Sequence, residues 1–469
     1  MRDHLYNYGQ PVSLEEALAA RDARAGRQRE LIEKHNCSLV SYTLNIAGLF
    51  KRSPIIDRCF FEGKTEIERM LPRAGDIADA ILTDTVTGME CLWAVRCDAL
   101  KLKSAMVSLE DSHALGRLFD IDIIGRDGGK ISRASLGMPE RGCLICGRPG
   151  SGCARSRTHS PDELADHTNR MISDYFNAKD AKDAKDAKDA KDATFIADCA
   201  TRAALYELSV TPKPGLVDRV SNGAHRDMDF FTFLDSSVAL SGYFLDMARS
   251  GIENRNIPAG ELLAMLRGRG LEAEREMFRV TGGVNTHKGL IFSLGIICVA
   301  CGYLGCPIAD AGDALDLAAS VAAPAARDDL MNVARLGAKT NGEKAYADHG
   351  VSGARGEAAS GFASARMWGL VPLRDALGRG ASLNDAGVVA LISLIANVND
   401  TNVISRVGMD AFMEIQAEIR AFLSSSPSDA AIIRYAWELD QRFTEKNISP
   451  GGCADLLAIT FMLHFMTSA

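Results

Sequence analysis

Two aspartates in the first half of the chain have the spacing of a metal-binding pair. Asp120 and Asp122 stand two residues apart in the segment GRLFDIDIIG, residues 116–125. Alternate residues of a strand point to one face, so both carboxylates could bind the same Mg²⁺ ion. Such a pair suits phosphoryl or nucleotidyl transfer, and Arg117 could bind a phosphate beside it. Solvated acids on an edge strand are the alternative interpretation.

A cluster of thiols and one imidazole follows in the segment RGCLICGRPGSGCARSRTH, residues 141–159. Its glycines and proline let the chain fold back, so a Cys₃His zinc site is geometrically reasonable. Reduced thiols packed among loop residues are the alternative. The four candidate ligands are Cys143, Cys146, Cys153 and His159. The same segment carries a basic patch suited to phosphates, formed by Arg141, Arg148, Arg155 and Arg157.

The second half opens with a dense group of ionisable residues, TPKPGLVDRVSNGAHRDMD, at positions 211–229. Two prolines stiffen the backbone around Lys213, and Gly215 leaves room for a phosphate to approach. His225 follows as a further substrate-binding candidate. If Asp227 and Asp229 are extended they share a face and could bind Mg²⁺. The alternative is a helix cap followed by exposed acids.

Three later segments add polar groups from distant points of the chain. GGVNTHKGLIF (282–292) places Asn285 and Lys288 before an apolar helix, where free N–H groups favour an anion. An ordinary N-cap with a surface lysine is the alternative there. HGVSGARGEAASGF (349–362) adds Arg355 and Glu357, and NDTNVISRVG (399–408) adds Arg406. A helical bundle can bring such groups to one interhelical cleft.

The elements that must position these groups differ between the two halves. Alternating segments before residue 177 predict an α+β or α/β domain, with strands in 38–48 and 116–125 and helices over 14–34 and 160–176. Apolar residues at helical spacing predict an all-α domain over 195–469. Its expected helices cover 231–250, 260–279, 311–321, 383–397, 430–443 and 453–466.

Residues 178–194 between the two halves repeat Ala-Lys-Asp. A period of three matches neither a strand nor a helix, so the tract presents no steady apolar face and is predicted to be a spacer. Its Lys-to-Asp pairs four apart have the weaker orientation, so partial helicity is expected. The sequence thus predicts domains at 1–177 and 195–469 joined by a linker.

Composition limits the class of protein. The 469 residues are 47% hydrophobic, and the net charge of −8 argues against a partner held by nucleic-acid phosphates. The first residues lack an apolar signal region, so a cytoplasmic protein with reduced or metal-bound cysteines is expected. The uncharged run 289–306 is near the lower limit for a membrane span, but its glycines favour a buried helix, and no membrane partner is expected.

The motifs of the first half resemble a known family. GRLFDIDII, ISRASLGMPERGCLIC and CARSRTHS look like the phosphoribosyl-dephospho-CoA transferases that load the prosthetic group onto the acyl carrier protein of citrate lyase. The resemblance implies a nucleotidyltransferase-like domain in which a carrier serine attacks an α-phosphate and pyrophosphate leaves. Asp120 and Asp122 would be its catalytic Mg²⁺ ligands.

The second half resembles the triphosphoribosyl-dephospho-CoA synthases through TPKPGLVD, GAHRDMD, GVNTHKG, GARGEAASGF and NISPGGCADLLA. The implied reaction joins ATP and 3'-dephospho-CoA and releases adenine. An oxocarbenium-like transition state at C1' of the ribose would need nearby carboxylates and a base for the attacking hydroxyl. Lys213, Lys288 and Arg406 would hold the triphosphate, Asp227 and Asp229 would bind Mg²⁺, and Glu357 would be the base.

Together these resemblances imply consecutive enzymes in one chain. Its expected partners are ATP, 3'-dephospho-CoA and the apo acyl carrier protein of citrate lyase, with Mg²⁺ as cofactor and Zn²⁺ as a second candidate metal. Three alternatives remain open: the equivalent pathway for malonate decarboxylase, an ADP-ribosyl hydrolase fused to a regulatory domain, and a zinc-containing scaffold without activity.

Overall fold

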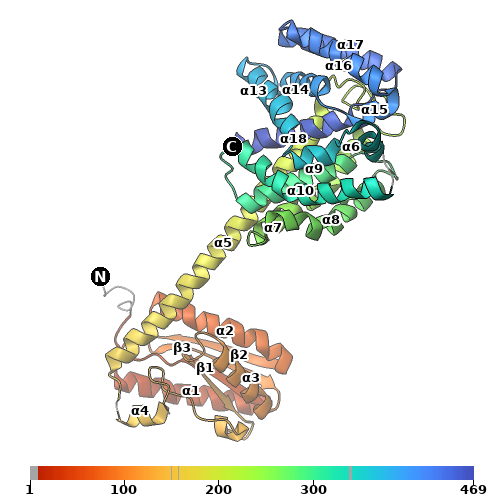
Figure 1. The fold of residues 1–469 in the computed structure, drawn as a ribbon. Helices are drawn as coiled ribbons and strands as arrows, with labels where there is room; N and C mark the ends of the chain where they lie inside the picture. The colour runs from red at the N-terminus through yellow and green to blue at the C-terminus, as the bar shows by residue number, and fades with distance from the viewer. Residues whose placement is uncertain (1–8, 149, 157, 337–340, 469) are drawn as a thin grey trace. The chain divides into compact units, whose positions relative to one another are not determined.

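The chain forms two compact units, Met1–Ala184 and Lys185–Ala469, which we call the mixed unit and the helical unit (Figure 1). The computed structural model describes residues 9–148, 150–156, 158–336 and 341–468. Each unit has its own hydrophobic core, so each is described by itself.

The mixed unit is built on an antiparallel sheet with the strand order β2-β3-β1-β4-β5. In the register of β1 against β4, Thr43 lies opposite Asp120 and Ser41 lies opposite Asp122. The strands are β1 (Ser38–Leu44), β2 (Asp76–Thr85), β3 (Gly88–Arg96), β4 (Phe119–Ile124) and β5 (Lys130–Ile131).

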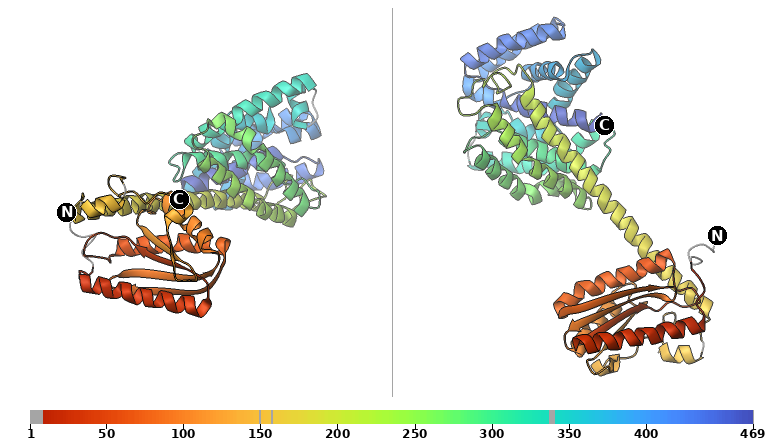
Figure 2. Two further views of the ribbon diagram at one scale, coloured as in Figure 1. Left: turned by 90° about the horizontal axis from the view of Figure 1, so that it is seen from below. Right: turned by 180° about the vertical axis from the view of Figure 1, so that it is seen from behind.

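Helices cover both faces of this sheet. Helix α1 (Leu14–His35) packs through Leu31 on one face, while α2 (Pro54–Ala74) and α3 (Ala99–Ser112) bury the other face (Figure 2, left). The polar side chain of Ser13 starts α1 in a capping box with Glu16, which satisfies backbone N–H groups that the first turn leaves unpaired. The mixed fold expected for the first half is confirmed in its coarse form.

After the sheet come η1 (Arg133–Leu136), the short helix α4 (Gly150–Ser156) and the long helix α5 (Pro161–Ser209). The Ala-Lys-Asp tract lies entirely inside α5, so the expectation of partial helicity was wrong. Salt bridges stabilise the start of the tract, since Lys179 binds Glu62 and Asp180 binds Arg58 within the mixed unit. The middle of the tract is exposed and has no apolar face, but it can stay helical because both ends of α5 are packed.

The helical unit confirms the expected all-α architecture. Its described residues beyond the end of α5 include the π-helical segment η2 (Ala365–Leu370). Its α-helices are α6 (Phe230–Ala239), α7 (Ser241–Glu253), α8 (Ala259–Val280), α9 (Lys288–Leu304), α10 (Ala311–Leu336), α11 (Asn341–His349), α12 (Gly353–Ala359), α13 (Val371–Gly378), α14 (Leu383–Asn397), α15 (Thr401–Val407), α16 (Met409–Ser424), α17 (Asp429–Glu445) and α18 (Gly451–Thr467).

Helices α9, α14 and α18 are apolar on nearly all sides and form the interior of this unit. Helices α7 and α9 touch through glycines, because a Cβ on Gly251 would lie 2.2 Å from the carbonyl oxygen of Val299. The run 289–306 is therefore a buried helix, as expected. The expected helix 231–250 is instead two helices with a break at Leu240, and the expected helix 311–321 extends to Leu336.

Within the described parts of the chain, a single helix with the length and apolar character of a membrane span is not found. The bent pair Leu383–Asn397 and Thr401–Val407 meets the criterion only when its two helices are taken together.

The start of α5 anchors the mixed unit, and this can be tested with a pair of alanine variants. Phe176 is 2% exposed and packs in the sheet core, whereas Lys182 is exposed. We expect Phe176→Ala to lower the free energy of unfolding of the mixed unit by about 3–5 kcal/mol. Lys182→Ala should change it by less than about 0.5 kcal/mol. Urea-dependent hydrogen exchange of β1 and β3 measures both, and equal losses would contradict the packing.

Candidate functional sites

The two aspartates of β4 lie on the face of the sheet that α1 covers. Phe119, Ile121 and Ile123 are buried against the opposite helices, so the intervening carboxylates point away from that core. The predicted common face of Asp120 and Asp122 is confirmed. The Asp120 carboxylate accepts a hydrogen bond of 3.5 Å from Thr43, and Asp122 forms an ion pair of 2.6 Å with Lys130.

Asp120 borders a pocket of about 280 Å³ between α1 and the sheet. Arg21 and Arg24 line it from α1, and Lys51 lines it from the loop before α2. Arg24 donates to the buried carboxylate of Glu90 over 2.9 Å. Burial lowers the pKa of Lys51, whose ammonium donates to the carbonyl of Ile46. The pocket thus combines cations with a carboxylate able to bind a metal.

Sequence reasoning missed these pocket cations. Arg21 and Arg24 line the pocket and Arg27 pairs with Glu90. All three are spaced three apart in α1, which puts them on one side of the helix. This spacing was a usable signal. It was overlooked because an isolated helix rich in charge is also what a solvated surface helix looks like.

Arg117, expected to bind a phosphate, instead holds a loop. Its guanidinium donates to the carbonyl oxygen of Gly142. In the opposite direction, the guanidinium of Arg141 in the loop donates to the carbonyl oxygens of Gly116 over 2.6 Å and of Phe119 over 2.8 Å. The cysteine loop is therefore fastened to the residues that lead into β4.

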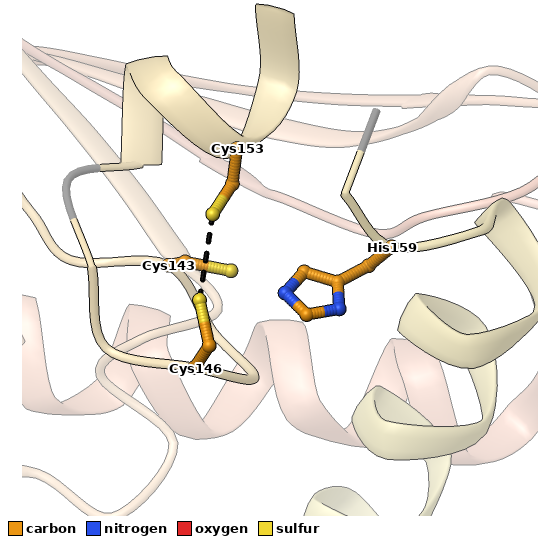
Figure 3. Close-up of side chains that lie close together, drawn as sticks. All are labelled: Cys143, Cys146, Cys153 and His159. Carbon is orange, nitrogen blue, oxygen red and sulfur yellow. Dashed lines mark hydrogen bonds between the residues drawn. The ribbon is translucent and has the colours of Figure 1, made fainter. Parts of the chain in front are cut away.

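The predicted cysteine and histidine cluster is brought together in the structure. The ligand atoms of Cys143, Cys146, Cys153 and His159 all lie within 4.8 Å of one another (Figure 3). A hydrogen bond from His159 lowers the pKa of the Cys146 thiol to about 5, with Arg148 contributing to the same shift. Arg155 is exposed, and Arg157 lies outside the described residues.

A buried ion pair marks the polar interior of the helical unit. Lys213 is 2% exposed, and its ammonium lies 2.5 Å from the carboxylate of Glu207 on α5. Its backbone N–H donates to Asp218, and Gly215 donates to Asp440 over 2.9 Å. These carboxylates fix the loop that sequence analysis expected to approach a phosphate.

Gly215 is required by this geometry. Its φ of +68° is left-handed, and a Cβ would lie 2.0 Å from the carbonyl oxygen of Ile448.

Two histidines lie close enough to Lys213 for its charge to affect them. Burial, helped by Lys213, lowers the pKa of His287 to about 3, so this imidazole is neutral. Its Nδ1 is 2.7 Å from Ser236 Oγ, while its buried Nε2 has no hydrogen-bond partner among the described residues. Burial and the charge of Arg406 lower the pKa of His225, which contacts Ser449 over 2.8 Å.

Three carboxylates lie together in this interior, of which Glu207 and Asp400 are buried and Asp455 is half-buried. Burial raises the pKa of Asp455 well above its ordinary value, and the charges of Glu207 and Asp400 raise it further. Asp400 caps α15 and also accepts the backbone N–H of Cys453 over 3.0 Å. Gly289 leaves the space that Asp455 needs, because a Cβ there would lie 2.0 Å from its Oδ2.

Glu357 has the environment of a candidate base. One carboxylate oxygen accepts a hydrogen bond of 2.7 Å from Ser364, and the other is buried without a hydrogen-bond partner in the described part of the chain. Burial raises the pKa of this carboxyl. Glu357 also contributes to the raised pKa of the Cys453 thiol, as do Asp400 and Asp455, which places it near the carboxylate group.

The other predicted residues of the second half are placed more superficially. The half-exposed Lys288 pairs with Glu274 over 2.9 Å, and its backbone N–H donates to Asn285. Arg406 donates to Asn447, and Arg355 is partly exposed on α12.

The predicted Asp227 and Asp229 pair is not held as a pair of free ligands. Asp229 caps α6 by accepting the backbone N–H and the hydroxyl of Thr232, which is the alternative that the sequence left open. Asp227 is exposed, with a carboxylate oxygen 4.0 Å from Nδ1 of His225.

Sequence reasoning missed Glu207, Asp440 and Asp455. Glu207 and Asp440 are each one acid among several in their helices, and no local motif distinguishes any of the three from a solvated acid. Asp455 lies within the quoted motif NISPGGCADLLA, so the apolar run around it was the available signal.

Comparisons with known proteins match both halves. Residues 193–469 match the family described as ATP:dephospho-CoA triphosphoribosyl transferase, and residues 12–175 match the family described as apo-citrate lyase phosphoribosyl-dephospho-CoA transferase. Protein CitXG of Haemophilus influenzae and protein CitXG of Leuconostoc mesenteroides subsp. cremoris are each 32% identical to the chain, over 97% of both sequences. A probable 2-(5''-triphosphoribosyl)-3'-dephosphocoenzyme-A synthase of Albidiferax ferrireducens is 42% identical over 57% of this chain and 89% of its own length.

The neutral His287 predicts how acid affects stability. Below pH 6.5 the unfolded chain binds a proton at this imidazole that the folded chain does not bind, so stability falls as pH falls. The slope should approach about 1.4 kcal/mol per pH unit. We expect His287→Gln to remove this slope and the exposed His349→Gln to retain it, as measured by urea unfolding between roughly pH 5 and 7. Identical slopes in the wild type and His287→Gln would contradict the buried neutral imidazole.

Proposed function

Because the chain belongs to the family of fused proteins that combine these two transferase domains, we propose that its units carry out consecutive steps of one biosynthesis. The protein is a bifunctional transferase that makes and attaches the prosthetic group of citrate lyase. The helical unit makes 2'-(5''-triphosphoribosyl)-3'-dephospho-CoA, and the mixed unit transfers it to the apo acyl carrier protein. The enzymatic assignment removes the alternative of an inactive scaffold.

The observation that supports this most is the separation of two polar sites. Each family match falls within a different compact unit, and each unit has its own set of buried ionisable groups. Two reactions with different bond changes need two such sites. ATP and dephospho-CoA also favour a cytoplasmic location for the protein.

In the helical unit, the 2'-hydroxyl of dephospho-CoA attacks C1' of the ATP ribose, and the bond from C1' to adenine breaks. Glu357 takes the hydroxyl proton, which fits a carboxylate with one unpartnered oxygen. Asp455 gives a proton to the leaving adenine, a role that fits a carboxyl group whose pKa is raised. The ionised members of the carboxylate group stabilise positive charge at C1'.

Binding of the triphosphate in this unit uses residues around the 211–218 loop. Lys288 and Arg406 supply positive charge, and Lys213 adds to it from its buried ion pair with Glu207. Gly215 lets this loop pass close to the backbone of Ile448, which fixes its position. His225, Asn285 and Arg355 complete the expected contacts.

In the mixed unit, a nucleotidyltransferase-like reaction attaches the group. The serine hydroxyl of the carrier attacks the α-phosphate, the bond to the β-phosphate breaks, and pyrophosphate leaves. Arg21, Arg24 and Lys51 line the pocket beside Asp120 and hold the phosphates there.

Hard carboxylate oxygens on one face of β4 fit Mg²⁺, so Asp120 and Asp122 would hold the metal in the mixed unit. When bound, the ion supplies charge neutralisation for the triphosphate and pyrophosphate. In the helical unit the fit is poorer, because Asp229 is used as a helix cap and only Asp227 is free of such a role.

The proposal is tested by adenine release. Purified protein is incubated with ATP and Mg²⁺, with and without 3'-dephospho-CoA, and the nucleotide product is analysed by mass spectrometry. Adenine that appears only with dephospho-CoA, together with the triphosphoribosyl adduct, is the expected result. Adenine that is released equally well without dephospho-CoA would favour the hydrolase alternative.

Substituting the proposed base should separate binding from chemistry. Glu357→Gln is expected to lower adenine release by roughly a hundredfold to ten thousandfold and to leave ATP binding intact. Since burial raises the pKa of Glu357, wild-type release should increase with pH as this group loses its proton. Glu438→Gln, on the exposed side of α17, is the matched control. Near-normal turnover of Glu357→Gln would remove it from this role.

The mixed unit allows the reciprocal experiment. Asp120→Asn should lower transfer of the pre-made group to the carrier by about a hundredfold or more, because it removes a proposed metal ligand. Adenine release should be unchanged, and Asp76→Asn on the edge strand β2 should alter neither activity. A loss of both activities in Asp120→Asn would show that the two sites are not independent.

A further inference from the structure

The cysteine and histidine cluster has the donor set and spacing of a closed zinc site. Its ligand atoms lie within 4.8 Å of one another, and the sulfurs of Cys146 and Cys153 are 3.4 Å apart. Tetrahedral zinc with Zn–S bonds of about 2.3 Å places neighbouring ligands about 3.7 Å apart. Figure 3 shows the three sulfurs and the imidazole of His159 directed toward one another. Small movements of side chains would therefore complete the coordination.

The backbone between the first two cysteines is folded as a tight knuckle. The N–H of Gly147 donates to the carbonyl oxygen of Cys143 over 3.0 Å. Gly147 has a φ of +71°, which glycine adopts without strain. A Cβ on Gly142 would lie 2.5 Å from the carbonyl oxygen of Gly147. Such close packing holds Cys143 and Cys146 on the same side of the turn.

The loop has little apolar packing to hold it. Leu144 is the described residue of segment 141–159 that packs against the sheet core, and α4 has only seven residues. Cys153 comes from α4 and His159 from the turn before α5, so a shared metal ion would join three separate pieces of backbone. Small segments without their own core commonly rely on a disulfide or a metal for this purpose.

A disulfide between Cys146 and Cys153 is the competing use of these residues. It would leave Cys143 and His159 without a role, although both side chains converge on the same point. Arg148 donates from Nε to the sulfur of Cys146 over 3.5 Å, the kind of hydrogen bond that supports a metal-bound thiolate. The four-residue donor set favours the metal.

We propose that Cys143, Cys146, Cys153 and His159 bind one structural Zn²⁺ ion, and that this ion holds the loop that positions β4. Arg141 precedes the knuckle and binds the carbonyl groups of Gly116 and Phe119. Arg117 binds Gly142 in return. The zinc loop is thus fastened to the residues next to Asp120. The positioning part of the proposal rests on the proposed transfer reaction, whereas the zinc site does not.

The first experiment measures zinc directly. The full-length protein, purified without chelators, should contain one zinc per chain by elemental mass spectrometry. Cys146→Ser, Cys153→Ser and His159→Ala should each lower zinc content about tenfold or more. Cys306→Ser, in a half-buried thiol of the helical unit, should retain it. Replacement of zinc by Co²⁺ should give the visible bands of tetrahedral thiolate ligation. Absence of both metals, or a Cys146–Cys153 disulfide in freshly purified protein, would overturn the site.

A second experiment tests positioning. Removal of zinc with a chelator should lower transfer to the carrier, and added Zn²⁺ but not Mg²⁺ should restore it. Adenine release by the helical unit should remain unchanged. Full transfer activity in the zinc-free protein would overturn the positioning role. If wild-type protein bound zinc but catalysed neither reaction, the proposed function would fail and the zinc site would stand.

Discussion

The helical unit depends on one buried charge and its partner. Lys213 and Glu207 are almost fully buried and 2.5 Å apart. Removing either partner alone would leave an uncompensated charge, which typically costs about 3–5 kcal/mol. The pair also joins the loop after α5 to α5 itself. Further along the loop, Asp218 accepts the backbone N–H of Lys213, and Asp440 accepts that of Gly215.

In the mixed unit, the register of the strands fixes where the ionisable groups lie. Pairing of β1 with β4 places Thr43 opposite Asp120. On the same face, the carboxylate of Glu90 on β3 accepts a hydrogen bond from Arg24 of α1. A shift of one residue would turn the aspartates into the apolar core. The side chains of Arg117 and Arg141 stabilise this register from outside the sheet. Site geometry in this unit thus follows from how β4 is held at its beginning.

Local patterns predicted some elements closely and others poorly. Helix α14 has the predicted bounds because Ser382 caps an unbroken apolar period. The cysteine cluster was predictable because its spacing brings ligands together within one loop. The full helicity of the Ala-Lys-Asp tract was not, since packing at the ends of α5 overrides weak internal propensity. Strands β2 and β3 were also missed. Glu207 and Asp455 meet only through folding, and no sequence period connects them.

The raised pKa values of the buried acids have an electrostatic consequence for substrate capture. The formal net charge of −8 counts every aspartate and glutamate as ionised. Burial raises the pKa of Glu207, Asp400 and Asp455, so the interior of the helical unit disfavours their charged forms, and Lys213 compensates the charge of Glu207. An incoming polyanion therefore meets a local field less repulsive than the overall charge implies, and an acidic protein can still admit a triphosphate.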